Sequence, residues 1–263
     1  MTTQTATRSA RTQPRGTQRP ATFLDAVASE WIKIRTHRGV LLALLIGVGV
    51  TALAGANNTS ANVRNILDGA DAPGDLTGIT QFGMKFGVIA FAVAGALAMT
   101  SEYSSGMIRT SLTAVPSRGR FLAAKAIAFT TVALVPGLIA STTSFVIGRS
   151  LLSGAGVQLD PTDPGVLRAL VGGGLFLATS GLLALVLGAL LRNPVATVGC
   201  VFALYVLPSF LGPELSRRIH PFEAGDAITR AAGGTAWSGY VILLAWTVVI
   251  AAGAYAAMRR RDA

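Results

Sequence analysis

The sequence has 263 residues, of which 51% are hydrophobic and only 13% are charged, a composition that excludes an ordinary soluble globular domain. The net charge of +10 does not indicate a nucleic-acid partner, because the basic residues lie mostly at the ends of long uncharged runs. These runs predict an all-α polytopic membrane protein whose surroundings are the lipid bilayer. The single cysteine, Cys200, excludes an intrachain disulfide.

The first 21 residues form a tract rich in Thr, Gln, Arg and Pro, which predicts a disordered cytoplasmic tail before a membrane domain over residues 22–263. Directly after this tail, apolar residues recur at helical spacing, which predicts a helix lying in the cytoplasmic membrane interface. An N-terminal extension of the first span stays the alternative. The apolar stripe consists of Phe23, Val27, Trp31 and Ile34, whereas Asp25, Glu30, Lys33 and Arg35 are expected mostly elsewhere around the helix.

About six apolar windows are long enough to cross a bilayer. The fourth and fifth are separated only by residues 191–194, so they are expected to form an antiparallel hairpin. The predicted spans are residues 40–56, 82–100, 121–147, 166–191, 195–211 and 239–258.

Basic residues gather in alternate connecting segments, and this asymmetry predicts the orientation. One set of segments contains the N-terminal tail, the connection after the second span, Arg192 and the C-terminal residues 259–261. The opposite set holds most of the acidic residues. We therefore expect both termini on the cytoplasmic side.

The sequence contains no motif for enzymatic chemistry. A phosphate-binding loop needs Gly-Lys-Ser or Gly-Lys-Thr, and none of the three lysines follows a glycine. The two histidines, His37 and His220, are predicted on opposite sides of the membrane, which excludes a shared metal site. No carboxylate pair is expected inside the bilayer. We expect a chain that is not an enzyme and that binds no cofactor or metal.

Two kinds of residue inside the spans carry information. We assign Lys125 to the basic connection, which leaves Lys85 as the one ionisable side chain expected within a span. Lys85 either anchors its helix by reaching the headgroups or lines a substrate path. Small residues at helical spacing predict close helix contacts, within one subunit or between two. These are Gly83 and Gly87 in the second span and Gly174, Gly181 and Gly188 in the fourth.

The connection after the second span is short, charged and patterned. It reads Ser-Glu-Tyr-Ser-Ser-Gly-Met-Ile-Arg-Thr-Ser-Leu over residues 101–112, followed by Pro-Ser-Arg-Gly-Arg over 116–120 and then by Lys125. An ordinary basic loop that fixes topology is one interpretation. The other is a small helix along the cytoplasmic surface.

This segment resembles the Glu-Tyr-x-x-Gly-x-Ile-Arg-x-x-Leu and Pro-x-Arg-x-x-x-x-x-Lys pattern of bacterial type-2 ABC exporter permeases. Residues 29–38 resemble the opening of that family, which forms an interfacial helix, and residues 208–225 resemble its partly re-entrant outer segment. In the family the patterned connection forms the coupling helix. The resemblance assigns to ATPase coupling the residues Glu102, Tyr103, Gly106, Arg109, Arg118 and Arg120.

The resemblance implies a permease subunit in the bacterial cytoplasmic membrane that pairs with a second permease subunit, as a homodimer or heterodimer. A separate ATP-binding subunit would carry ATP and Mg. The expected substrate is amphipathic or hydrophobic and is exported. A stand-alone channel or secondary carrier and a membrane scaffold without transport activity stay as alternatives.

Overall fold

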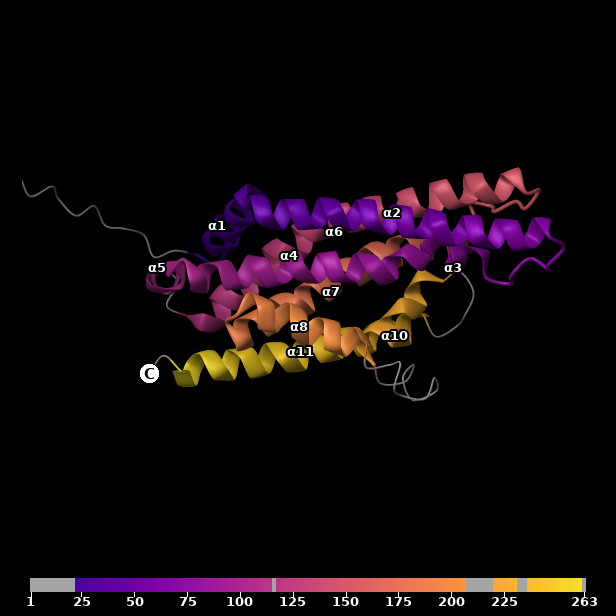
Figure 1. Ribbon diagram of the computed structural model, residues 1–263. Coiled ribbons are helices and arrows are strands. Elements are labelled where there is room, and N and C mark those ends of the chain that lie inside the picture. The colour runs from indigo at the N-terminus through magenta and orange to yellow at the C-terminus, as the bar shows by residue number, and fades with distance from the viewer. Residues whose placement is uncertain (1–21, 115–116, 207–219, 231–235, 262–263) are drawn as a thin grey trace, which may run out of the picture.

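The computed structural model describes residues 22–114, 117–206, 220–230 and 236–261, and in these ranges the chain is a bundle of helices without strands (Figure 1). The long helices α2, α4, α6 and α7 run alternately up and down the bundle (Figure 1). The elements are α1 Phe23–Thr36, α2 Arg38–Leu67, α3 Leu76–Thr80, η1 Gln81–Gly83, α4 Met84–Ser104, α5 Met107–Ala114, α6 Arg118–Gly154, α7 Pro164–Leu191, α8 Pro194–Val206, α10 Pro221–Asp226, η3 Ala227–Thr229 and α11 Ala236–Arg261.

Five helical stretches in the described ranges are long and apolar enough to cross a membrane: α2, the stretch from α3 through α4, α6, α7 and α11. They contain the predicted spans 40–56, 82–100, 121–147, 166–191 and 239–258. The all-α polytopic fold is thereby confirmed. The predicted fifth span, 195–211, begins in α8, which has 13 residues, and its last residues lie outside the described ranges.

Helix α7 lies at the centre of the bundle. In its most apolar window 78% of residues are buried inside the protein, against 22% for α11. Such a helix is apolar around its whole circumference, as expected for one packed on every side. It contacts α4, α6 and α11, so a displacement of α4 or α6 acts directly on the central helix.

Glycines allow the closest helix approaches. A Cβ atom at Gly83 would overlap the backbone carbonyl oxygen of Thr51 in α2, and one at Gly95 would overlap that of Gly181 in α7. The backbones of α2, α4 and α7 therefore pack without intervening side chains. This accounts for α4 being one of the best-buried spans.

The helix ends follow local sequence rules. Thr22 and Asp25 form a capping box at the start of α1, where the Asp25 backbone N–H donates to the Thr22 hydroxyl. His37 separates α1 from α2, and its Nδ1 accepts a hydrogen bond from the Val40 backbone N–H at 3.2 Å. The N-terminal helix is therefore a separate element rather than an extension of the first span. The predicted α7–α8 hairpin is also present, and its turn uses Arg192 at φ 57°.

The connections sort to two ends of the bundle. Helices α1 and α5, the α7–α8 turn and the C-terminal end of α11 lie at one end, and α3 and α10 lie toward the other (Figure 1). This is the grouping that the distribution of basic residues predicts. The structure contains no membrane, so the assignment of this end to the cytoplasm stays a prediction.

Candidate functional site: a buried charge cluster at the α1 end

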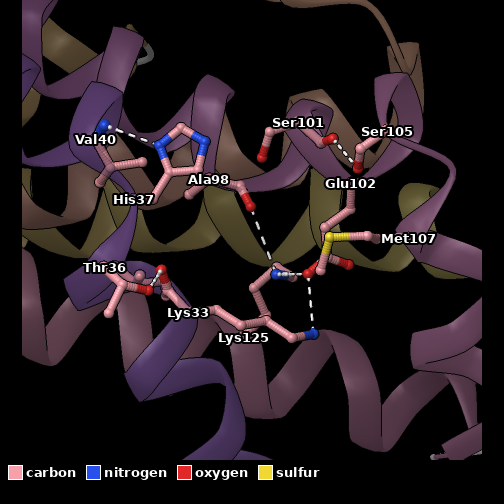
Figure 2. A pocket seen from close by; sticks show the side chains of 11 residues that line it. Lys33, Thr36, His37, Val40, Ala98, Ser101, Glu102, Ser105, Met107 and Lys125 are labelled. Carbon is pink, nitrogen blue, oxygen red and sulfur yellow. Dashed lines mark hydrogen bonds and ion pairs between the residues drawn. The ribbon is translucent and has the colours of Figure 1, made fainter.

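Four charged side chains from three helices meet at the α1 end of the bundle. We call Glu30, Lys33, Glu102 and Lys125 the charge cluster. The Lys125 ammonium contacts Glu30 Oε2 and lies 2.8 Å from Glu102 Oε1. The Lys33 ammonium lies 2.6 Å from Glu30 Oε1 and 3.1 Å from the same Glu102 oxygen. Figure 2 shows the two ammonium groups converging on that oxygen.

The charge cluster is balanced, and three of its four side chains are almost completely shielded from solvent. The side chains of Lys125, Glu30 and Glu102 are 1%, 4% and 6% exposed, and that of Lys33 is 32% exposed. Two carboxylates and two ammonium groups compensate one another, which is the condition under which buried charges are tolerated. The cluster therefore fixes α1 against α4 and α6 with defined geometry.

Lys33 is the member nearest to the surface. Burial would lower the pKa of its ammonium group, but hydrogen bonds and attraction from Glu30 and Glu102 outweigh it and raise the pKa above its ordinary value of 10.5. Lys33 also donates a hydrogen bond to the Ser111 hydroxyl of α5 at 3.0 Å. The patterned connection is thus tied to the cluster.

A tight turn sets the direction of α5. Helix α4 ends at Ser104, and Gly106 follows with φ 71°, a left-handed conformation in which a side chain is strained. The Gly106 backbone N–H donates to the Tyr103 carbonyl at 3.3 Å. This glycine lets α5 leave the bundle axis immediately after α4.

Two further residues of the coupling set contact other helices. The Tyr103 ring lies 5.2 Å from the Arg192 guanidinium in the α7–α8 turn. Arg118, the first residue of α6, donates to the Met258 carbonyl oxygen near the end of α11. Both contacts place cationic groups where helix C-termini carry partial negative charge. The end of α4 and the start of α6 are therefore connected to the α7–α8 turn and to the end of α11.

A cavity of about 340 Å³ lies beside the charge cluster, between α1, α4 and the start of α5 (Figure 2). Lys33, His37, Glu102, Met107 and Lys125 are among its lining residues. The second carboxylate oxygen of Glu102, Oε2, is buried and has no hydrogen-bond partner within the described ranges. A residue that lines the cavity therefore has a buried acceptor atom without a donor in the described part of the chain.

The structure corrects the predicted orientation of α1. The residues of α1 that are buried are Ala26, Glu30 and Ile34, so Glu30 faces the bundle and not the polar side. Phe23 is 37% exposed, Val27 and Trp31 are half-buried and Arg35 is exposed. Ile34 of the predicted apolar stripe is also buried, so only the expected position of Glu30 is wrong, because its carboxylate is compensated by Lys33 and Lys125.

The structure also corrects the assignment of charges to spans. Lys125 lies in the second turn of α6, inside the predicted window 121–147, and is fully buried. Lys85 is therefore not the one ionisable side chain in a span. It lies half-buried in the first turn of α4, with its ammonium 5.7 Å from the centre of the Phe82 ring. Its anchoring and path-lining roles both stay open.

The structure describes some of the remaining predicted residues but not all of them. The packing glycines lie against neighbouring helices: a Cβ at Gly87 would overlap Thr51, one at Gly174 would lie 2.6 Å from Leu138, and one at Gly188 would lie 3.2 Å from Thr100. Arg120 is exposed. The side chain of Arg109 and residues 207–219 lie outside what the structure describes. In the described part of the chain, no group of three or more His, Cys, Asp or Glu residues is arranged to hold a metal ion.

Sequence reasoning missed that Glu30, Glu102 and Lys125 act as one unit. The sequence feature that could have indicated the cluster was Lys125 inside the apolar window 121–147, because a buried charge requires a partner. The partner could not be identified, since Glu30 and Lys125 are 95 positions apart.

Comparison with known proteins agrees with this architecture. The model of a family described as ABC-2 family transporter protein matches residues 26–209, a range that contains most of α1, all of α2 through α8 and all four members of the charge cluster. No curated protein matches the chain.

Proposed function

Because the chain belongs to the ABC-2 transporter family, and is thus the permease of an ABC transporter, we propose that it is one of two permease subunits of an exporter in the bacterial cytoplasmic membrane. Each permease subunit would engage a separate ATP-binding chain. The single observation that carries this proposal is the charge cluster, which joins the patterned connection to the membrane-spanning helices.

The coupling route follows from the contacts. Movement of α5 acts on Lys33 through Ser111, and Lys33 shares carboxylates with Lys125 of α6. Helices α4 and α6 both pack against central α7. A push from the ATP-binding subunit on α5 would therefore move α1, α4 and α6 together, which is the kind of rigid-body shift that switches access to a path.

The partner must supply the ATP site. The sequence has no phosphate-binding loop, so ATP and Mg would be held by the ATP-binding chain. In this proposal Glu102 would accept a hydrogen bond from a basic side chain of that subunit, and the exposed Arg120 would pair with an acidic one. Arg109 belongs to the same proposed contact by its position in α5.

The topology within this proposal has six spans and both termini inside. It requires that α8 and the residues after it complete a crossing, and that the end carrying α1, α5 and the C-terminus faces the cytoplasm. The apolar character of the spans favours an amphipathic or hydrophobic substrate.

A charge-reversal comparison tests the coupling assignment. The ATP-binding chain is sought in a neighbouring reading frame with Gly-x-x-x-x-Gly-Lys-Ser or Gly-Lys-Thr, co-purified with the permease and assayed for ATP hydrolysis in vesicles. Arg120→Glu is expected to reduce both recovery of the complex and hydrolysis. Arg64→Glu, an exposed arginine in the last turn of α2 at the opposite end, is the matched control.

Two outcomes would overturn the proposal. Undiminished complex and hydrolysis in Arg120→Glu would remove the coupling role of this surface. Substrate flux through the permease alone, without an ATP-binding chain, would instead support a channel or carrier.

A further inference from the structure

A groove of about 520 Å³ lies on the outside of the bundle between α1, α2 and α6. Its walls are apolar side chains of α2 and α6, among them Leu41, Leu45 and Val135. Its α1 end carries Trp31 and Arg35. Both walls belong to membrane-spanning helices, so an occupant would lie partly among the lipid chains.

Arg35 has a positive charge that no carboxylate of the described residues neutralises. Its guanidinium lies 5.6 Å from the centre of the Trp31 ring, and its side chain is exposed. Within the described ranges it forms no ion pair with a carboxylate, and no carboxylate lines the groove. The neighbouring Lys33, by contrast, forms ion pairs with Glu30 and Glu102.

This arrangement fits the two chemical parts of a phospholipid. The planar donor fork of arginine matches phosphate oxygens, and tryptophan favours the headgroup level of a membrane. Leu41 and Leu45 are four residues apart, so the apolar wall extends about 6 Å along α2 and accommodates the first part of one acyl chain. Because the groove has no acidic residue to receive a choline or an amine, a net negative headgroup is favoured.

We propose that this groove is a binding site for one anionic phospholipid, with the phosphate on Arg35 and one acyl chain between α2 and α6. The site lies outside the charge cluster and does not depend on the proposed transport function. Its occupant would press on α1, the helix that the cluster connects to α4 and α6.

Trp31 provides a direct reporter of the site. The chain has three tryptophans, and Trp237 and Trp246 are 54% and 39% exposed, so both can be replaced by Phe to leave Trp31 alone. The full-length protein is placed in phosphatidylcholine vesicles, and its fluorescence is quenched with brominated phosphatidylglycerol or brominated phosphatidylcholine. We expect phosphatidylglycerol to bind beside Trp31 about fivefold more tightly, the preference that one basic residue near the membrane surface provides.

Substitutions distinguish a site from a diffuse surface charge. Arg35→Gln should abolish the preference, so that phosphatidylglycerol and phosphatidylcholine bind about equally. Arg35→Lys should keep part of the preference for phosphatidylglycerol, because the charge remains while the planar fork is lost. Arg38→Gln is the matched control, since Arg38 is also exposed and basic but does not line the groove. It should keep the full preference.

Three results would overturn the proposal. One is equal quenching by the two lipids in the protein with Arg35 intact, a measurement that does not require any substitution at the site to fold. A second is an equal loss of preference in Arg38→Gln and Arg35→Gln. The third is displacement by soluble glycerol 3-phosphate at the lipid's own concentration, which would identify a phosphate site rather than a lipid site.

Discussion

Replacement of Lys125 by methionine tests whether the charge cluster holds the α1 end together. The substitution approximates the length of the lysine side chain and removes its charge, which leaves the buried carboxylates of Glu30 and Glu102 to share Lys33. Removing one partner of a buried ion pair costs about 3–5 kcal/mol, and the remaining contacts of Lys33 place the expected loss near the lower limit, about 3 kcal/mol. For a chain of this size that corresponds to a fall of about 6–12 °C in the melting temperature.

The assay is the monodisperse fraction of detergent-solubilised protein after heating, measured by gel filtration. Lys85→Met is the matched control, because Lys85 is half-buried and lies outside the charge cluster, with its ammonium 5.7 Å from the centre of the Phe82 ring. Loss of that cation–π contact should lower the melting temperature by about 2–4 °C at most. The double variant Glu30→Gln with Lys125→Met restores charge balance and should recover about 1–2 kcal/mol of the loss. Equal falls for Lys125→Met and Lys85→Met, or no recovery in the double variant, would refute the reasoning.

Three further predictions concern the glycines and Lys33. Gly95→Ala should destabilise the protein by more than about 2 kcal/mol because its Cβ would overlap the α7 backbone, whereas Gly49→Ala, which has open space, should be neutral or stabilising in the same melting assay. Gly106→Ala should cost about 1–2 kcal/mol, since an L-residue is strained at φ 71°, and should lower ATP hydrolysis in the complex if α5 is turned by it. The raised pKa of Lys33 means that its contribution to stability is complete below the ordinary value of 10.5 and is lost as the pH rises through the folded-state pKa, so the melting temperature should fall more steeply above pH 10.5 in the unaltered protein than in Lys33→Met.

The sequence predicted those parts of the fold that depend on residues close together in the chain. Apolar windows located α2, α4, α6, α7 and α11, because exclusion of water from a helix of about 20 residues is a local property. The hairpin at residues 191–194 was also predicted from local sequence, because a connection this short forces two spans to be antiparallel neighbours. The helices extend beyond the apolar windows of the sequence, because polar residues can continue a helix outside the lipid.

The site was predicted less completely. Glu102 and Gly106 were identified within the patterned connection, and the structure places Glu102 in the charge cluster and Gly106 in the turn before α5. The burial of Glu30 and Lys125 was missed, since each looks like a surface charge unless its partner on another helix is known. Long-range compensation of charge is a property of the assembled bundle and leaves no periodicity in the sequence.

The order of synthesis gives the charge cluster a second consequence. Glu30 and Lys33 leave the ribosome first, Glu102 follows about seventy residues later, and Lys125 comes last. Until α6 has been made, the carboxylates of α1 and α4 share only the Lys33 ammonium, and they gain their buried partner when Lys125 arrives. A chain truncated before α6 would retain this imbalance, so the last charged member of the cluster to be synthesised is the one that completes its charge balance.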